Sequence, residues 1–214
     1  MKDAVIVSTA RTPIGRAFRG AFNNTKSPTL MAHALKHAAD RSGVDYGEIE
    51  DVVIGTTMAA GSASLNIARM GSLAAGFPES VPAQTIERQC SSGLMAIATA
   101  AKQIICDGMG IVAAGGQENI SEIQSRYFEW AGEAQDENVI AHSKNAYMPM
   151  LMTAEYVAKK YKISRDAQDA YAMLSQQRTA QAQAGGKFDA EIVPITTSKI
   201  VVDKASGESR YEGV

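Results

Sequence analysis

Two hydrophobic periods alternate along the first half of the chain. Short runs with a strand pattern lie at 4–9, which is rich in β-branched residues, and at 51–57, 83–89 and 110–116. Between them, apolar positions recur at helical spacing, and they predict helices at 27–43, 64–76 and 91–105, each closed by a glycine. A repeated order of strand, helix and strand is typical of a parallel or mixed sheet with helices on its faces.

The pattern changes after the fourth predicted strand. Residues 117–150 are mostly polar with little periodicity, which predicts a long irregular excursion. Helical spacing then returns at 152–161 and 164–185, and short apolar runs at 190–197 and 199–203 look like strands. This second part of the chain is therefore expected to be only partly helical.

These elements predict an α/β fold, with a mixed sheet flanked by helices and an inserted, partly helical loop domain. We assign residues 1–120 to the α/β core, and residues 121–214 to the loop domain and the start of the return to the core. A length of 214 residues suits one domain with a sizeable insertion, and 45% hydrophobic residues are enough to build its core. The sequence stops at "RYEGV" without a closing element, so we expect the front part of a longer protein.

Charge and composition narrow the class of protein. The net charge of −2 gives no basic surface for nucleic acid, and no apolar run approaches the ~20 residues that span a bilayer. The start "MKDAVIVSTA" has an early acidic residue and makes a poor signal peptide. The two cysteines, Cys90 and Cys106, do not have zinc-binding spacing. We therefore expect a cytoplasmic protein with free thiols, no metal, no nucleic-acid partner and no membrane segment.

The stretch "RQCSSG" places Cys90 between a predicted strand and a predicted helix. Ligands bind at the carboxyl ends of parallel strands, and the free N–H groups of a helix start stabilise an anion such as a thiolate. Gly93 removes a side chain from the first turn and would let a substrate approach. The helix is apolar nearly all round, so we expect it to be buried. From position alone, Cys90 is either a nucleophile or a small buried apolar residue.

The neighbours of Cys90 are given smaller roles. Ser91 and Ser92 could cap the helix or shape the turn, without a part in catalysis. Cys106 lies near the end of the same helix, where the helix dipole disfavours a thiolate, and is expected to be structural.

Histidines are the other candidates for chemistry. His33 and His37 have the spacing of a metal-binding pair on one helix, but no third ligand is evident, so a solvated surface is the better interpretation. His142 lies in the predicted excursion and could serve Cys90 as a base, although nothing in its spacing indicates this.

Several motifs together resemble the amino-terminal half of the thiolase family. They are "VPAQTIERQCSSGLMAI", "AAGGQENIS", "ARTPIG" and "TAEYVAKKYKISRDAQDAYAMLSQQRTAQAQAGGKFDAEIVP", and the resemblance covers essentially the whole chain. The cysteine motif and the long helical stretch are specific, whereas "ARTPIG" alone is weak. The resemblance implies an acyltransferase that cleaves a 3-ketoacyl-CoA with coenzyme A (CoA), or runs the reverse Claisen condensation of acetyl-CoA. CoA would be a substrate, and no cofactor would be tightly bound.

The resemblance also implies roles for single residues. In thiolases, the cysteine at the position of Cys90 is the acylated nucleophile, and its backbone N–H is one donor to the oxyanion. By resemblance, Glu118 and Asn119 in "GGQENIS" orient the loop around Cys90; the alternative is a Gly-Gly turn with solvated polar side chains. Met150 lies in "YMPMLMTAE", which in thiolases borders the acyl pocket, so it either lines that pocket or belongs to the core.

The sequence departs from the thiolase pattern at positions that affect the expected acyl substrate, and it lacks the motifs of the carboxy-terminal half. The sequences "PML" and "RQCSS" replace those common in short-chain biosynthetic members, which favours a broad or degradative enzyme. By resemblance, the histidine that activates the nucleophile and a second cysteine come from a carboxy-terminal half, whose motifs do not occur here. The active protein is therefore expected to need that half. The resemblance also implies a homodimer or homotetramer.

Two other functions stay open. A β-ketoacyl synthase also presents a cysteine at a buried helix start, but the helical stretch at 153–194 matches the thiolase insertion instead. Transfer from acyl carrier protein rather than CoA would support that enzyme. A thiolase-like protein without turnover would bind acyl-CoA or lipid and leave Cys90 without an acyl group.

Overall fold

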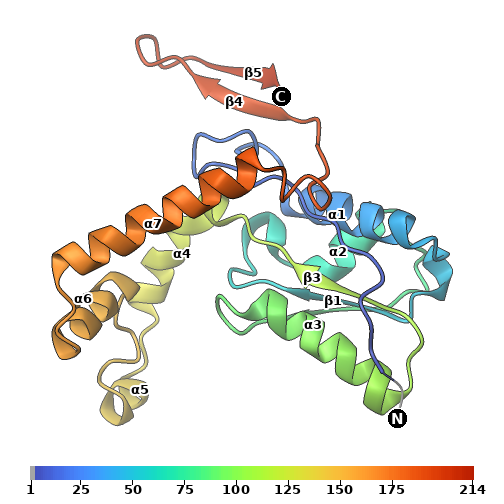
Figure 1. The fold of residues 1–214 in the computed structure, drawn as a ribbon, viewed down its shortest axis with the longest axis horizontal. Helices are drawn as coiled ribbons and strands as arrows, with labels where there is room; N and C mark the ends of the chain where they lie inside the picture. The colour runs from blue at the N-terminus through green and yellow to red at the C-terminus, as the bar shows by residue number, and fades with distance from the viewer. Residues whose placement is uncertain (1–2) are drawn as a thin grey trace. The chain divides into compact units, whose positions relative to one another are not determined.

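The computed structural model describes residues 3–214 and divides them into two compact units (Figure 1). The first unit contains the residues up to Tyr127 together with Glu191–Val214, and the second contains Phe128–Ala190. The chain thus leaves the first unit once and returns to it, as around an inserted domain. The core expected at 1–120 extends to Tyr127, and the return to it begins at Glu191.

A three-stranded parallel sheet forms the centre of the first unit. β1 (Asp51–Gly55) is its middle strand and pairs in parallel with β2 (Ala83–Ile86) on one side and β3 (Val112–Gly116) on the other. Every residue of β1 is buried, because the strand is covered on both faces. The second, third and fourth predicted strands are confirmed, although each is shorter than predicted. All pairings in this sheet are parallel, and the antiparallel pairing belongs to a separate hairpin.

Helices cover both faces of this sheet. α1 (Ser27–Ser42) and α2 (Ile67–Ala74) lie together on one face, and α3 (Ser92–Lys102) lies on the other (Figure 1). The hydrophobic core lies between α1, α2 and the sheet. Its side chains include Met31, Leu35, Val52, Ile54, Ile67 and Val81. Parallel strands joined by helices are the α/β arrangement that the sequence pattern predicts.

α3 packs on the sheet through small side chains, including Ala96 and Ala100, and continues as a π-helix over Gln103–Asp107. Its other side is open, because Leu94 is 73% exposed and Ile97 is 41% exposed. The prediction of a helix buried all round is therefore wrong. The sheet covers only one face of α3, and the apolar residues on the opposite face stay at the surface.

The first predicted strand, at 4–9, is also wrong. These residues form no strand, and their apolar side chains are exposed: Val5 by 74%, Ile6 by 75% and Val7 by 74%. β-Branched residues favour an extended backbone, but a strand also needs a neighbour to pair with. An isolated bridge joins Arg11 to Ile192, and apart from this bridge the run at 190–197 forms no strand either.

The last residues form an antiparallel hairpin of β4 (Ser198–Val202) and β5 (Ser209–Gly213). The side chain of Asn23 binds the outer edge of β4. Its Nδ2 donates to the carbonyl of Ile200 at 2.8 Å, and its Oδ1 accepts the N–H of the same residue at 2.8 Å. Asn23 thus takes the place of a third strand at this edge. β4 confirms the strand predicted at 199–203, whereas β5 has no counterpart in the prediction.

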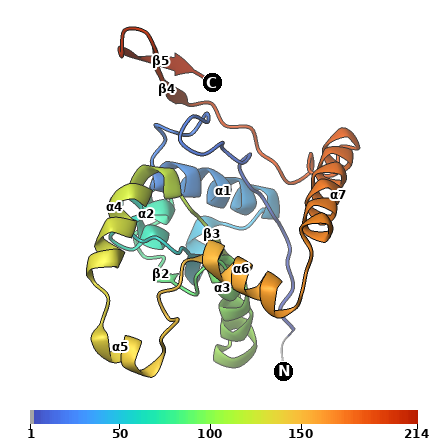
Figure 2. The same cartoon turned by 90° about the vertical axis from the view of Figure 1, so that its left-hand side faces the viewer.

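The second unit is helical (Figure 2). It contains the end of α4 (Ile120–Glu133), then α5 (Glu137–His142), α6 (Met150–Lys160) and α7 (Arg165–Ala184). α6 and α7 confirm two predicted helices, but the irregular excursion predicted at 117–150 is wrong, since α4 and α5 occupy much of it. Neither of these helices buries a residue. No helix within residues 3–214 combines the length and apolar character that a membrane crossing requires.

Candidate active site

Cys90 lies in the turn that joins β2 to α3, at the carboxyl end of a parallel strand. Its side chain is exposed and its thiol is free, so the alternative of a small buried apolar residue is wrong. Ser91, the N-cap residue of α3, follows directly, so Cys90 immediately precedes the helix start. Cys106 lies in the π-helix at the other end and is exposed too. Only Cys90 therefore lies at the amino-terminal end of α3.

Three glycines bring the start of α3 against the sheet. Gly55 ends β1, Gly116 ends β3, and Gly93 lies in the first turn of α3. A Cβ on Gly55 would lie 2.1 Å from the carbonyl carbon of Ser92, so only glycine allows this close approach. A Cβ on Gly93 would meet the Gly116 backbone at 3.5 Å, an ordinary contact. Gly55, to which the sequence pattern gave no role, therefore sets the position of the helix start. The predicted role of Gly93 in substrate approach stays a prediction.

Glu118 follows β3 and binds the loop that follows β1. Its carboxylate accepts the backbone N–H of Thr57 at 2.8 Å and that of Met58 at 3.3 Å. It also accepts the hydroxyl of Thr56 at 3.2 Å. These hydrogen bonds hold the carboxyl ends of β1 and β3 together, next to the start of α3. An effect of Glu118 on Cys90 itself stays a prediction.

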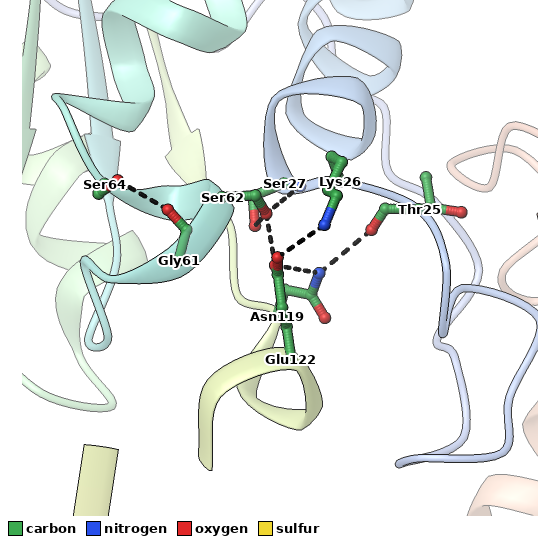
Figure 3. Close-up of polar contacts among 8 residues, drawn as sticks. All are labelled: Thr25, Lys26, Ser27, Gly61, Ser62, Ser64, Asn119 and Glu122. Atoms are coloured by element: carbon green, nitrogen blue, oxygen red, sulfur yellow. Dashed lines mark hydrogen bonds and ion pairs between the residues drawn. The ribbon is translucent and has the colours of Figure 1, made fainter. Parts of the chain in front are cut away.

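Asn119 belongs to a second polar cluster, shown in Figure 3. Its side-chain amide donates to the carbonyl of Thr25 at 3.1 Å and to the carboxylate of Glu122 at 3.2 Å. Glu122 also accepts the hydroxyl of Ser62 and forms an ion pair with Lys26 at 3.1 Å. We call these five residues the Glu122 network. It ties the segment before α1 and the short 3-10 helix around Ser62 to the first turn of α4. Like that of Glu118, the predicted role of Asn119 near Cys90 stays a prediction.

Nearly the whole chain matches a protein family, since residues 4–209 match the one described as Thiolase, N-terminal domain. The chain belongs to the thiolase family. It is 40% identical to the 3-ketoacyl-CoA thiolase of Bacillus subtilis, over 99% of this chain and 54% of the relative. It is 42% identical to the acetyl-CoA acetyltransferase of Cupriavidus necator, over 91% of this chain and 51% of the relative.

A solved thiolase-family structure has the same fold. The crystal structure of the Bacillus anthracis acetyl-CoA acetyltransferase matches with a TM-score of 0.75 and 32% sequence identity. The match covers 100% of this chain and 54% of that one, and it confirms the predicted thiolase-like α/β fold. The chain therefore spans about half the length of the relatives it matches.

The histidines of this thiolase-family chain do not form hydrogen bonds with Cys90 within the described residues. His33 and His37 have ring centroids 4.5 Å apart, and Nε2 of His33 lies 3.3 Å from the carbonyl oxygen of Val193. Both are half-buried rather than fully solvated, and burial, together with the charge of His33, lowers the pKa of His37. His142 ends α5 in the second unit. Residues 3–214 contain no cluster of three or more His, Cys, Asp or Glu side chains that could hold a metal.

Met150 is the first residue of α6 and is 77% exposed within the second unit. The two following residues, Leu151 and Met152, are exposed as well. The alternative in which Met150 belongs to the core is therefore wrong. An exposed apolar group of this kind can contact an acyl chain or another protein surface, so the lining of an acyl pocket by Met150 stays a prediction.

The Glu122 network makes the stability of this thiolase domain depend on pH. Partial burial acts to raise the pKa of Glu122, but hydrogen bonds from Ser62 and Lys26 outweigh it and hold the pKa below its ordinary value of 4.5. A carboxyl group whose pKa is lowered on folding stabilises the fold above its unfolded pKa. That contribution is lost as the pH falls through the folded pKa. Because the carboxyl group is partly exposed, we expect the contribution to be below about 1 kcal/mol.

Replacing Glu122 with glutamine is expected to remove this pH dependence, because the amide keeps the shape of the side chain but not its charge. Urea unfolding near neutral pH should give a lower free energy of unfolding for Glu122→Gln than for the wild type. The difference should shrink as the pH falls to about 3. Glu79→Gln, at an exposed glutamate outside the network, is the control. A difference of the same size at both pH values would show that the charge of Glu122 is not what stabilises the fold.

Proposed function

We propose that this chain supplies the acyl-accepting thiol of a thiolase that cleaves a 3-ketoacyl-CoA with CoA, or runs the reverse condensation of acetyl-CoA. The observation that carries the proposal is the exposed Cys90 at the start of α3, in a chain of the thiolase family. An accessible thiol at the start of a helix is suited to nucleophilic attack on a carbonyl carbon.

In the cleavage direction, the thiolate of Cys90 attacks the 3-keto carbonyl carbon. The backbone N–H of Cys90 is one donor to the tetrahedral oxyanion that forms. When the carbonyl reforms, the bond between C2 and C3 breaks, and the departing acetyl-CoA carbon takes up a proton. The acyl group stays on Cys90 as a thioester until the thiol of a CoA molecule attacks it, which releases a shortened acyl-CoA and restores the cysteine. The acyl-cysteine intermediate thereby divides the reaction into a carbon–carbon cleavage and a thioester exchange.

The residues around Cys90 act in this proposal by holding its surroundings in place. Gly93 lies where α3 meets β3, Glu118 fixes the loop after β1, and Asn119 belongs to the Glu122 network. We assign the transfer of protons to a histidine and a second cysteine in a carboxy-terminal half. CoA is a substrate, and the reaction needs no tightly bound cofactor.

We also propose a broad preference for acyl chain length, with Met150 contributing to the acyl pocket. The exposed apolar start of α6 supports this, because flexible and polarizable methionine side chains adapt to acyl chains of different length. A cytoplasmic homodimer or homotetramer is the form in which we expect the enzyme to act. The two free thiols agree with a reducing compartment.

The function is tested on the protein translated from the complete reading frame that contains these 214 residues. A series of 3-ketoacyl-CoA substrates should be cleaved only when CoA is added. The preference along the series should be graded, because one methylene in an apolar pocket is worth about 1–3 kcal/mol. Activity confined to the four-carbon substrate would contradict the broad preference. A requirement for acyl carrier protein would identify a β-ketoacyl synthase, and acyl-CoA binding without cleavage would identify a non-catalytic relative.

A further inference from the structure

A buried hydroxyl closes the turn that carries Cys90. The side chain of Ser92 is 3% exposed; its Oγ donates to the carbonyl of Gln89 at 2.6 Å and accepts the N–H of Arg88 at 2.8 Å. The backbone N–H of Ser92 donates to the carbonyl of Gln89 as well, at 3.0 Å. The Ser92 hydroxyl therefore bridges the two residues that precede Cys90, and Cys90 lies inside the bridged turn.

The backbone of Gln89 adopts an unfavourable conformation, which the contacts of this turn must stabilise. Its φ of 49° lies in the left-handed region, which residues other than glycine adopt only where the surrounding structure keeps them there. Its carbonyl accepts both the hydroxyl and the N–H of Ser92. Together with the bond from the N–H of Gln89 to the carboxylate of Glu87 at 3.3 Å, these two bonds to Ser92 keep Gln89 in this conformation.

The sheet supports the other side of Ser92. Its carbonyl group lies so close to Gly55 of β1 that a Cβ on the glycine would be 2.1 Å from the carbonyl carbon and 2.2 Å from the oxygen. Ser92 thus has its backbone against a fully buried strand and its hydroxyl on a surface turn. A side chain anchored in this way can transmit the rigidity of the sheet to a reactive group.

We propose that Ser92 is a positioning residue, whose hydroxyl holds the turn from Arg88 to Ser92 so that the thiol of Cys90 stays exposed at the start of α3. This inference rests on the proposed function, because it takes Cys90 as the nucleophile. Ser91 has no such role, since it is exposed and its side chain makes no capping hydrogen bond. The two adjacent serines therefore provide a matched pair of variants.

The test compares Ser92→Ala with Ser91→Ala in the 214-residue chain. Alkylation with iodoacetamide near neutral pH, followed by peptide mass spectrometry, measures Cys90 and Cys106 in the same molecule. Ser92→Ala should slow the alkylation of Cys90 about tenfold, because two hydrogen bonds of a buried hydroxyl are lost. It should leave Cys106 unchanged, and Ser91→Ala should leave both rates unchanged. Cys106 is the internal control for a general loosening of the fold.

A second pair of variants separates the hydroxyl from packing. Ser92→Thr keeps the hydroxyl, and Ser92→Val has nearly the shape of threonine without it. Threonine should therefore preserve the wild-type rate at Cys90, and valine should not. If Ser92→Ala does not fold, this comparison still tests whether the hydroxyl of Ser92 positions Cys90. Equal alkylation rates at Cys90 in the threonine and valine variants would then overturn the role of Ser92.

The outcomes distinguish this inference from the function on which it rests. A wild-type Cys90 that reacts no faster than Cys106 would argue against Cys90 as the nucleophile. A fast wild-type Cys90, together with equal rates in Ser91→Ala and Ser92→Ala, would overturn only the positioning role of Ser92.

Discussion

Replacing Cys90 with alanine is expected to lower kcat for 3-ketoacyl-CoA cleavage about a thousandfold or more in the protein translated from the complete reading frame. Without the sulfur atom, no thioester can form on the protein, and the two-step route is lost. The change removes a single atom from an exposed side chain, so the fold should be preserved. Steady-state assays with CoA, beside thermal unfolding of the same preparation, measure both effects.

Cys106→Ala is the matched control, since it removes the other exposed thiol from the opposite end of the same helix. This variant should keep wild-type activity. Wild-type protein incubated with acyl-CoA, and then digested, should carry one acyl group on the peptide that contains Cys90. An acyl group on Cys106 instead, or a Cys90→Ala variant within a few-fold of wild-type activity, would show that the nucleophile is misassigned.

The position of Cys90 could be predicted because its signals are local. A strand-like run, a short polar turn and an alanine-rich helix follow one another directly in the sequence. That order alone places the cysteine at the carboxyl end of a strand and at the start of a helix. The parallel pairing of β1, β2 and β3 follows from the same order, because strands joined through helices run in parallel.

Contacts between distant segments could not be predicted in this way. Gly55 is needed because the backbone of Ser92 lies against it, and the residues around Gly55 contain no sign of that helix start. A glycine as the last residue of a fully buried strand is the only local signal. Glu122 is a similar case, since its carboxylate meets Lys26 and Ser62 from two other segments of the chain.

Exposure could not be inferred from apolar character. The segment at 4–9 and the outer face of α3 have the apolar composition of buried elements, yet Val5 is 74% exposed and Leu94 is 73% exposed. An apolar pattern shows which residues can be buried, but burial also requires a second surface, and that surface is set by other parts of the fold. The helices α4 and α5 show the opposite case, since they form without burying any residue.

The 214-residue chain alone is expected to show no cleavage of 3-ketoacyl-CoA above background. A cysteine nucleophile needs a group that moves its proton, and no histidine among residues 3–214 is hydrogen-bonded to Cys90. His33 and His37 contact each other, and His33 also lies against Val193. Loss of a general base costs about a hundredfold to ten-thousandfold in rate. The backbone N–H of Cys90 is only one of the donors to the oxyanion, and loss of one donor lowers the rate about a hundredfold or more. The two losses in rate need not add.

Addition of the segment that follows in the complete reading frame is expected to restore cleavage. A fixed amount of the chain is mixed with increasing amounts of that segment, and the CoA-dependent initial rate should rise until the two are present in equal amounts. The same titration with Cys90→Ala should stay flat. The chain alone could be inactive because it lacks the proton-transferring groups or because it is misfolded. Iodoacetamide labelling distinguishes these two causes, because a folded chain should react at Cys90 and still not cleave the substrate. Robust turnover by the chain alone would place the base within these residues, and His142→Ala would then be the first variant to assay.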